Sequence, residues 1–427
     1  MTYANLLEYF NSLILSDRDR KFSGVEGLRR VGEILSLIGK PQNAYPVIHI
    51  AGTSGKGSTA FILSSLLNEA GLRTGLLLSP HIKDIKERIS IDGNLIKEDE
   101  FVATYESLKP IINQVGPVSY FELLTIIAFK YFSDKKIDYA VIETGLGGLL
   151  DATNVIDRRD KISIITKIGF DHTHILGESL KEIAQQKAGI IPSGGEVFVI
   201  DQTKEVLETI GKTAQSKTAK LNIVKRPITL DPINNIGRFL DWGDIKIGMY
   251  GEHQLENAAL CLSVFDLVIK QRKLKINKEK LIKRLENLQF PGRFEIKNIE
   301  EHIVVIDGAH NPQKIAALVK AVETKYSSSK KHYILSYKAN KDVINCLKAI
   351  IESASKIYIT SFEDNAELTK PPAYPPRKIA YELQQLGFHS YEIVEDVNRA
   401  LKLALGDKDA EIIVITGSMY LIGNLAL

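Results

Sequence analysis

The sequence predicts an α/β protein, with mostly parallel sheets covered by helices on both faces. Short apolar runs typical of buried strands alternate with stretches of helical periodicity along most of the chain, which is the pattern of doubly wound sheets. The length of 427 residues suits about two domains, each with its own core. A glycine-rich stretch, residues 52–59, lies between an early strand and a helix, where such sheets bind phosphates.

The first part of the chain contains apolar runs that we expect to form parallel strands. These runs are residues 46–50, 74–78, 138–143, 162–167 and 196–200. Segment 217–250 differs, because its short alternating runs are separated by turn signals such as Asp231-Pro232 and Trp242-Gly243-Asp244. We therefore expect a small antiparallel sheet in this segment, followed by a helix at about 252–270.

The alternation starts again after Pro291-Gly292-Arg293-Phe294-Glu295. The expected strands are 302–306, 332–336, 356–360, 390–394 and 411–415, and the expected helices lie near 312–325, 341–353, 376–386 and 395–405. We divide the chain into domains 1–297 and 298–427, the second a Rossmann-like α/β domain. The proline-rich piece 371–376 is expected to be a surface loop that could cover a site.

Composition and charge indicate an ordinary globular protein of the cytoplasm. Charged residues make up 25% and hydrophobic residues 44% of the chain, and the net charge is +3, so we expect no nucleic-acid or membrane partner. We see no apolar run of about 18 residues and no basic segment leading into an apolar one at the N-terminus, so we expect no membrane span and no signal peptide. Cys261 and Cys346 lie in apolar helical patterns and are expected to be buried thiols.

The glycine-rich stretch Gly52-Thr53-Ser54-Gly55-Lys56-Gly57-Ser58-Thr59 follows an apolar strand and precedes an apolar helix. A turn of this kind exposes backbone N–H groups beside the positive end of the helix dipole, so it can hold phosphate. Lys56 would reach the outer phosphates, and the hydroxyl of Ser58 or Thr59 would face them or their Mg²⁺. The spacing departs from the general P-loop, since only two residues separate Gly52 from Gly55. The alternative is a glycine-rich loop without function, but the strand before it and the helix after it favour an ATP-binding loop.

Polar residues follow several predicted strands, at the sheet edge where ligands bind. Ser79, Glu143 and His172 come after three of them and would converge on the phosphates if these strands neighbour the P-loop strand. Together they could hold Mg²⁺, with water and phosphate completing its shell. Imidazole is an unusual Mg²⁺ ligand, so His172 considered alone is more often a structural residue.

Two further sequence segments can be explained either by local structure alone or by a role in ligand binding. Lys187 lies in the last turn of a helix that we expect to end at Gly189, where a lysine is usually a solvated charge favoured by the dipole. The stretch Asp307-Gly308-Ala309-His310-Asn311-Pro312 combines an acid, a histidine and an amide after a strand, which suggests a ligand loop. It also suits a capped turn, with Asn311 as N-cap and Pro312 at the helix start, and both interpretations can hold together.

From about residue 25 onward the chain resembles the folylpolyglutamate synthase and dihydrofolate synthase family, within the wider group of Mur-type amide ligases. The resemblance is specific because many motifs occur in the same order. These motifs are His49 to Ser58, Ser79-Pro80-His81, Glu87-Arg88-Ile89, Glu143 to Gly148, Asp151-Ala152-Thr153-Asn154, Asp171-His172, Leu176-Gly177, Lys187 to Ile190, His253-Gln254, Asn257-Ala258, Pro291-Gly292-Arg293 and Asp307 to Pro312.

The resemblance implies roles for particular residues, with Lys56, Lys187 and His310 as the catalytic set. The residues implied to bind ATP are Gly55, Lys56, Gly57, Ser58, Asn257, Arg293 and Asp307. Ser79, Glu143 and His172 are implied Mg²⁺ ligands, and Lys187 resembles a carbamylated lysine that bridges toward a second Mg²⁺. Phe121, Ala152, Thr153 and Asn154 are implied to form part of the folate pocket, and His310, Lys341 and Asp342 to lie near the incoming glutamate. The resemblance is also compatible with a bound monovalent cation.

The implied reaction is ATP-dependent addition of L-glutamate to a folate or to dihydropteroate, through an acyl phosphate, by a cytoplasmic monomer. Ser54, Leu149, Gln186 and the loose motif 336–342 depart from the family pattern, chiefly near the acceptor pocket. One alternative is a Mur-type ligase with another carboxylate acceptor. A Mur ligase that joins an amino acid to a cell-wall nucleotide usually has a separate N-terminal domain for that nucleotide, and the roughly fifty residues before Gly52 are too few for one. The other is an ATP-binding switch without ligase chemistry. The sequence leaves open whether the enzyme adds the first glutamate to dihydropteroate, extends existing folates, or does both, and which folate it prefers.

Overall fold

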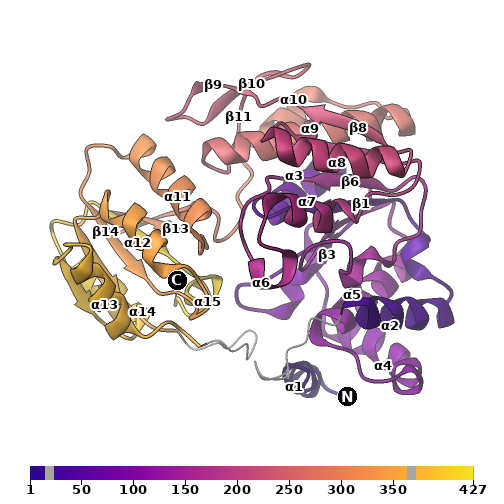
Figure 1. Cartoon of the computed structure of the whole chain (residues 1–427), viewed down its shortest axis with the longest axis horizontal. Coiled ribbons are helices and arrows are strands. Elements are labelled where there is room, and N and C mark those ends of the chain that lie inside the picture. The colour runs from indigo at the N-terminus through magenta and orange to yellow at the C-terminus, as the bar shows by residue number, and fades with distance from the viewer. Residues whose placement is uncertain (15–23, 363–371, 427) are drawn as a thin grey trace.

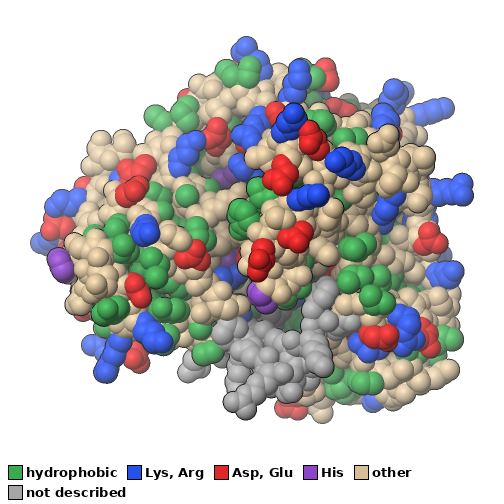
Figure 2. Space-filling view, viewed as in Figure 1, with side chains coloured by type: hydrophobic (Ala, Val, Ile, Leu, Met, Phe, Trp, Pro, Cys, Tyr) green, Lys and Arg blue, Asp and Glu red, His purple; other side chains and the backbone are tan. Residues whose placement is uncertain are grey.

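The computed structural model describes residues 1–14, 24–362 and 372–426. Two large sheets form two units that lie side by side, each covered by helices (Figure 1). The mixed α/β architecture confirms the predicted fold class. Charged side chains of both signs are scattered over the face shown in Figure 2, as expected from the near-neutral net charge. Within the described residues, no helix is both long and apolar enough to cross a membrane.

The first sheet has eight strands in the order β4-β3-β2-β5-β1-β6-β7-β8. Its strands are β1 (Val47–Ala51), β2 (Thr74–Leu77), β3 (Ile89–Ile91), β4 (Asn94–Leu95), β5 (Tyr139–Glu143), β6 (Ile162–Ile165), β7 (Glu196–Ile200) and β8 (Lys220–Val224). All pairs from β2 to β8 are parallel, and β3 and β4 add an antiparallel edge. The P-loop strand β1 is therefore central, between β5 and β6.

Helices cover both faces of this sheet because its strands are apolar on both sides. Ile48 and Ile50 of β1 pack with α3, α9 and α10, whereas Val47 points to the opposite core with α1, α2, α4 and α5. The helices are α1 (Tyr3–Ser12), α2 (Gly24–Leu37), α3 (Lys56–Glu69), α4 (Glu98–Val115), α5 (Tyr120–Asp134), α6 (Thr173–Leu176), α7 (Leu180–Ala188), α8 (Lys204–Ser216), α9 (Glu252–Arg272) and α10 (Lys278–Glu286).

The expected antiparallel sheet exists but is shorter than 217–250. It consists of β9 (Ile228–Asp231), β10 (Ile236–Phe239) and β11 (Gly243–Lys246). The segment 220–224 instead forms β8, which returns after helix α8 and pairs in parallel with β7. Assigning all of 217–250 to the small sheet was therefore wrong: β8 is a half-exposed edge strand, and its polar alternation resembles that of an antiparallel strand.

The second sheet has six strands in the order β12-β13-β17-β14-β15-β16, all parallel except for the β12–β13 pair. Its strands are β12 (Glu295–Ile299), β13 (His302–Ile306), β14 (Lys331–Leu335), β15 (Lys356–Ile359), β16 (Tyr391–Ile393) and β17 (Ile412–Thr416). Its helices are α11 (Pro312–Lys325), α12 (Val343–Ile351), α13 (Pro376–Gln385), α14 (Val397–Leu405) and α15 (Met419–Gly423). A division between 297 and 298 would cut β12, so we propose that the boundary lies before Glu295.

The remaining strand and helix predictions agree with the structure to within about two residues at most ends. Both cysteines are buried and free. Pro371 lies outside the described residues, but the backbone just after it pairs with the loop that follows β14. The Ala339 N–H donates to the Pro372 carbonyl oxygen at 3.0 Å, and the Tyr374 N–H donates to the Tyr337 carbonyl oxygen at 2.6 Å.

Candidate active site

Two adjoining cavities lie where the carboxyl ends of the two sheets meet. The first, of about 290 Å³, is lined by residues 52–58 together with Asn257, Arg293 and Asp307, and we call it the P-loop cavity. The second, of about 540 Å³, is lined by Phe121, Ala152 and Lys341 among others, and we call it the Phe121 cavity. The residues that line both cavities are Ser79, Pro80, Gly145, Leu146, His172, His310 and Met419. Ligands in the two cavities could therefore meet.

The P-loop passes so close to its neighbours that side chains are excluded at two of its positions. A Cβ atom on Gly52 would lie 1.8 Å from Thr166 Oγ1, and one on Gly55 would lie 2.5 Å from Asn257 Oδ1. Gly55 also has a φ of 88°, in the left-handed region that favours glycine. Helix α3 begins directly afterwards, at Lys56, so its positive end points into the cavity.

Glu143, at the end of β5, is the buried carboxylate nearest to the P-loop lysine. Its Oε1 lies 3.9 Å from Lys56 Nζ, and its Oε2 accepts a hydrogen bond of 2.9 Å from the Ser79 N–H. Burial raises the pKa of Glu143, although Lys56 opposes this shift. The sequence prediction that Ser79 and Glu143 converge beside the P-loop is therefore correct in geometry.

His172 directly precedes the short helix α6 and has a left-handed conformation, with φ 51°. Burial lowers its pKa to about 4, so the imidazole is neutral near pH 7 and could serve as a ligand. No three His, Cys, Asp or Glu side chains of the described residues are grouped so as to hold a metal. Mg²⁺ needs no such cage, because it usually takes one or two carboxylates together with water and phosphate oxygens. Glu143 and the Ser79 hydroxyl, beside the P-loop, fit that requirement.

Lys187 is buried, with 3% of its surface exposed, and is not the solvated charge that its place in a last helical turn suggests. Its Nζ donates a 2.8 Å hydrogen bond to the carbonyl oxygen of Gly52 in the P-loop. Burial, aided by the positive charge of Lys56, lowers the pKa of Lys187 to about 7. A large fraction of this amine is therefore neutral at physiological pH, and a neutral amine is nucleophilic.

Asn257, Arg293 and Asp307 all line the P-loop cavity, as the ATP prediction requires. Asn257 Nδ2 donates to Gln254 Oε1 at 3.0 Å, and Gln254 Nε2 donates to Ser58 Oγ at 3.3 Å, so α9 is tied to the P-loop. The two oxygens of Asp307 accept 2.8 Å hydrogen bonds from the N–H groups of Phe294 and Ala309. Asp307 thereby fixes the junction between the two units.

The 307–312 stretch is both a capped turn and part of the cavity wall. Asn311 caps α11 by accepting a 2.9 Å hydrogen bond from the Lys314 N–H, and its Nδ2 donates to Asp171 Oδ2 of the first unit at 3.0 Å. Lys341 Nζ lies 3.2 Å from Asp171 Oδ1. Burial alone would raise the pKa of Asp171, but Lys341 and other cations hold it well below its usual range. Asp171 therefore joins loops of both units.

The predicted folate and glutamate residues are not all in the cavity walls. Phe121 and Ala152 line the Phe121 cavity, whereas Thr153 bonds to His49 Nε2 at 2.7 Å inside the fold, and the Asn154 side chain donates to the Leu149 carbonyl oxygen at 3.0 Å. Asp342 is exposed and caps α12 by accepting from the Asn345 N–H; it lines neither the P-loop cavity nor the Phe121 cavity.

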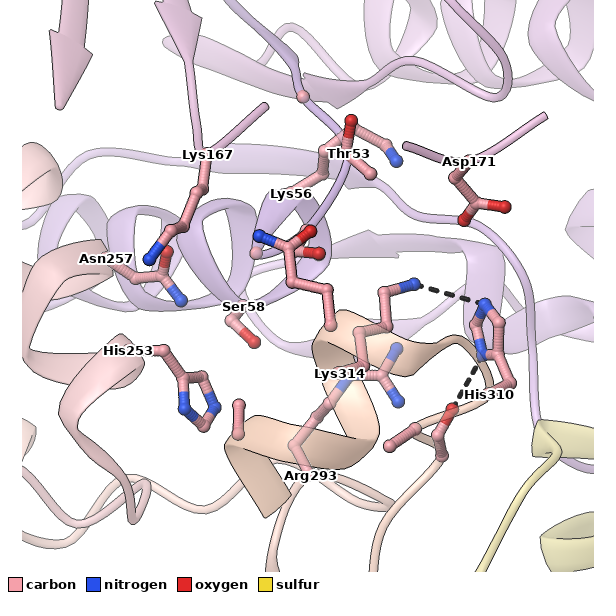
Figure 3. A pocket seen from close by; sticks show the side chains of 18 of the residues that line it. Thr53, Lys56, Ser58, Lys167, Asp171, His253, Asn257, Arg293, His310 and Lys314 are labelled. Carbon is pink, nitrogen blue, oxygen red and sulfur yellow. Dashed lines mark hydrogen bonds between the residues drawn. The ribbon is translucent and has the colours of Figure 1, made fainter. Parts of the chain in front are cut away.

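Sequence reasoning gave no role to three charged residues of the site: Asp171, Arg88 and Lys314. Arg88 is 2% exposed and lines the Phe121 cavity, and Lys314 lines the P-loop cavity (Figure 3). Asp171 and Arg88 lie inside recognised motifs, so a signal existed for both. Lys314 lies in the first turn of an ordinary helix, and no sequence pattern marks it. Leu149, which departs from the family pattern, is 42% exposed and lines neither cavity.

Comparison with known proteins places this site in a family. A family model for the Mur ligase middle domain matches residues 50–265, and a model for the dihydrofolate synthetase C-terminal domain matches residues 293–427. The dihydrofolate synthase/folylpolyglutamate synthase of Bacillus subtilis is 31% identical over 423 residues, which cover 95% of each chain. The chain belongs to the folylpolyglutamate synthase/dihydrofolate synthase family.

Solved structures of this family share the whole fold. Escherichia coli FolC in complex with DHPP and ADP has a TM-score of 0.84 and 25% identity, covering 99% of this chain and 96% of that one. A bifunctional folylpolyglutamate synthase/dihydrofolate synthase with Mn, AMPPNP and L-glutamate bound has a TM-score of 0.82 and 26% identity, covering 99% and 97%. These likenesses confirm the family resemblance expected from the motifs.

Proposed function

We propose that this chain is an ATP-dependent ligase that adds L-glutamate to the carboxylate of a folate, of dihydropteroate, or of both. The observation that carries this proposal is the junction of the P-loop cavity with the Phe121 cavity at Ser79, His172 and His310. A nucleotide held by the P-loop and an acceptor held beside Phe121 would bring the γ-phosphate and a carboxylate together there. Relatives with ADP and DHPP, or with AMPPNP and L-glutamate, support this choice of ligands.

The reaction proceeds in two displacements. The acceptor carboxylate oxygen bonds to the γ-phosphorus while the bond to the β–γ bridging oxygen breaks, which releases ADP and leaves an acyl phosphate. The glutamate amine then attacks the acyl carbon, phosphate leaves with its oxygen, and the amine loses its proton. Gly55, Lys56, Gly57 and Ser58 hold the phosphates, with Asn257, Arg293 and Asp307 completing the nucleotide site. Lys56 and Arg293 supply positive charge to the phosphoryl group in transit.

Mg²⁺ would be held by Glu143 and Ser79, with His172 as a further ligand, and when bound it would neutralise phosphate charge. Lys187 is proposed to carry a carbamate that serves a second Mg²⁺. Its buried amine, with a pKa of about 7, supports this assignment, because carbon dioxide adds only to a neutral amine. A monovalent cation could also bind at the active site, but no contact among the described residues indicates where it would bind.

The Phe121 cavity is proposed to take the pterin side of the acceptor. Phe121 and Ala152 would contact it directly, and Thr153 and Asn154 would hold the loop that carries Ala152. His310 and Lys341 would lie near the incoming glutamate. Asp342, which caps α12, would act there only through the position of Lys341. We expect the enzyme to be a cytoplasmic monomer, which sedimentation would test.

The test is product mass after incubation with MgATP, L-glutamate and either dihydropteroate or tetrahydrofolate. We expect a gain of one or more glutamyl units that depends on ATP and is matched by ADP release. Which acceptor reacts decides whether the first glutamate is added, a tail is extended, or both. Nucleotide binding without product from either acceptor would overturn the folate assignment and point to a Mur-type ligase with another carboxylate acceptor.

A further inference from the structure

Lys314 has no part in the function proposed so far, yet it lies in the wall of the P-loop cavity. It is in the first turn of α11, and the same face of this helix contributes Ala317 and Leu318 to that wall. Lysines in the first turn of a helix are unfavourable for the dipole, so neither helix stability nor solvation accounts for this position. In Figure 3 the Lys314 side chain extends from the helix toward His310, to which a dashed line joins its Nζ.

The only hydrogen-bond partner of the Lys314 ammonium among the described side chains is neutral. Lys314 Nζ lies 3.1 Å from Nε2 of His310, whose Nδ1 lies 2.7 Å from the Gly308 carbonyl oxygen (Figure 3). Because a carbonyl oxygen only accepts, Nδ1 carries the proton and Nε2 accepts from the ammonium. No carboxylate of residues 1–14, 24–362 or 372–426 forms an ion pair with Lys314. Lys314 is half-buried in the cavity wall, and a positive charge at this place with so little compensation would be stabilised by an anionic ligand.

The charge of Lys314 acts at the phosphate end of the cavity. Burial is the largest influence on the pKa of Glu143, Asp171, His172 and Lys187, but Lys314 contributes to the pKa of each of them. The groups that act in turn on the pKa of Lys314, after burial, are Asp171, Lys56, Arg293 and Lys341. Burial lowers the pKa of Lys314 itself to about 7, and a bound phosphate would favour its charged form.

Lys314 and Lys341, both in the second unit, line different cavities. Lys341 lines only the Phe121 cavity and is paired with Asp171, whereas Lys314 lines only the P-loop cavity. An incoming amino acid or acceptor carboxylate would therefore meet Lys341 first, and a nucleotide would meet Lys314. An ammonium has three protons, so it can keep its bond to His310 and still donate to a phosphate oxygen.

We propose that Lys314 is a further catalytic residue, which binds the terminal phosphate of ATP and follows it onto the acyl phosphate. It supplies from the second unit a positive charge that faces Lys56 across the transferred phosphoryl group. This inference rests on the proposed nucleotide site but not on the identity of the acceptor.

The test compares equilibrium binding of ADP and of AMPPNP, each with Mg²⁺, by titration calorimetry without acceptor or glutamate. Lys314→Met keeps the length of the side chain and removes its charge, and Lys314→Arg keeps the charge. We expect Lys314→Met to lose about ten- to hundredfold of its affinity for AMPPNP, since charged hydrogen bonds are worth that much, and less than about threefold for ADP. Lys314→Arg should retain the preference for AMPPNP.

The matched control is Lys320→Met, on the same helix but with a side chain that is 70% exposed and outside the cavity. It should leave both affinities unchanged. Equal losses for ADP and AMPPNP in Lys314→Met, or no loss for either, would overturn the proposal. An increase confined to the KM for glutamate would also overturn it and assign the ammonium to the amino acid. If Lys314→Met does not fold, Lys314→Gln and Lys314→Arg allow the same comparison.

This experiment also separates the two proposals. Wild-type protein that binds both nucleotides, with the expected effect of Lys314→Met, but makes no glutamylated product would overturn the folate assignment and leave the phosphate role of Lys314 in place. If wild type makes glutamylated product but Lys314→Met binds AMPPNP as tightly as wild type does, the phosphate role of Lys314 is overturned and the folate assignment stays in place.

Discussion

Gly55 shows how closely the P-loop and helix α9 approach each other. We expect Gly55→Ala to lower the free energy of unfolding by about 1–3 kcal/mol, because alanine is strained at a φ of 88°. It should also weaken nucleotide binding, since the added Cβ would lie 2.5 Å from Asn257 Oδ1 and displace that side chain. Urea unfolding and ADP titration measure the two effects.

Gly71→Ala is the matched control for this prediction. Gly71 has a similar φ of 84°, but no atom lies within 4 Å of the position that its Cβ would take. Gly71→Ala should lower the free energy of unfolding by a similar amount and leave the affinity for ADP unchanged. Unchanged ADP affinity in Gly55→Ala would contradict the close approach of Asn257.

Lys187 gives a prediction about pH. Its pKa of about 7 is below that of a free lysine, about 10.4, so the amine is largely neutral above about pH 7 and becomes an ammonium below it. Carbamate on Lys187, measured by carbon-13 NMR with labelled bicarbonate, should therefore be present at about pH 8 and lost by about pH 6. Lys187→Arg should remove the signal. A carbamate signal that persists in that variant would come from another amine.

At the scale of elements, helix α5 carries Phe121 in its first turn, and its N-terminus is held by a reciprocal cap. Ser119 Oγ accepts from the Glu122 N–H, and Glu122 Oε2 accepts from the Ser119 N–H at 3.0 Å. We expect Ser119→Ala to cost about 1 kcal/mol of stability and to weaken acceptor binding, because Ser119 and Phe121 line the same cavity. Thermal unfolding and the KM for the acceptor measure these effects.

Asn277→Ala serves as the control for Ser119→Ala. Asn277 caps α10 by accepting a 3.1 Å hydrogen bond from the Lys280 N–H, and it lines neither cavity. Its loss should cost a similar amount of stability with no change in the KM. Equal changes in KM for both variants would show that the effect is general destabilisation and would refute a local role for the α5 cap.

At the level of the whole molecule, two ion pairs between described residues join the units, and they differ in burial. Lys341–Asp171 is nearly buried, at 13% and 14% exposed, whereas Lys320–Glu252 is 70% and 55% exposed. We expect Lys341→Met to cost about 3 kcal/mol at pH 7, because it leaves a buried carboxylate without its partner. Lys320→Met should cost less than about 1 kcal/mol.

The Lys341 effect should depend on pH in a defined direction. The folded-state pKa of Asp171 is depressed, so its contribution to stability is complete above its unfolded pKa of about 3.9 and is lost as the pH falls further. The difference in unfolding free energy between wild type and Lys341→Met should therefore be constant from about pH 7 to about pH 5 and shrink below about pH 4. A difference that grows with acidity would contradict this account.

Most of the helices and strands, and the P-loop, could be predicted from the sequence. Apolar periodicity marks β1, β5, β13 and α11 because burial on one or both faces leaves a local pattern, and Gly52 and Gly55 mark a tight turn for the same local reason. It did not mark β8 or β12, since the polar alternation of an edge strand is compatible with more than one sheet.

Which side chains line the same cavity could not be predicted from the sequence, because it depends on how distant elements pack. Lys187 looks like a solvated helix-end lysine and Lys314 like an ordinary one, yet both are directed into the P-loop cavity by the packing of α7 and α11. Asp171 and Lys341, 170 positions apart, form an ion pair because the carboxyl edges of two separate sheets face each other. Electrostatic environment depends on such distances in space, and periodicity along the chain does not encode them.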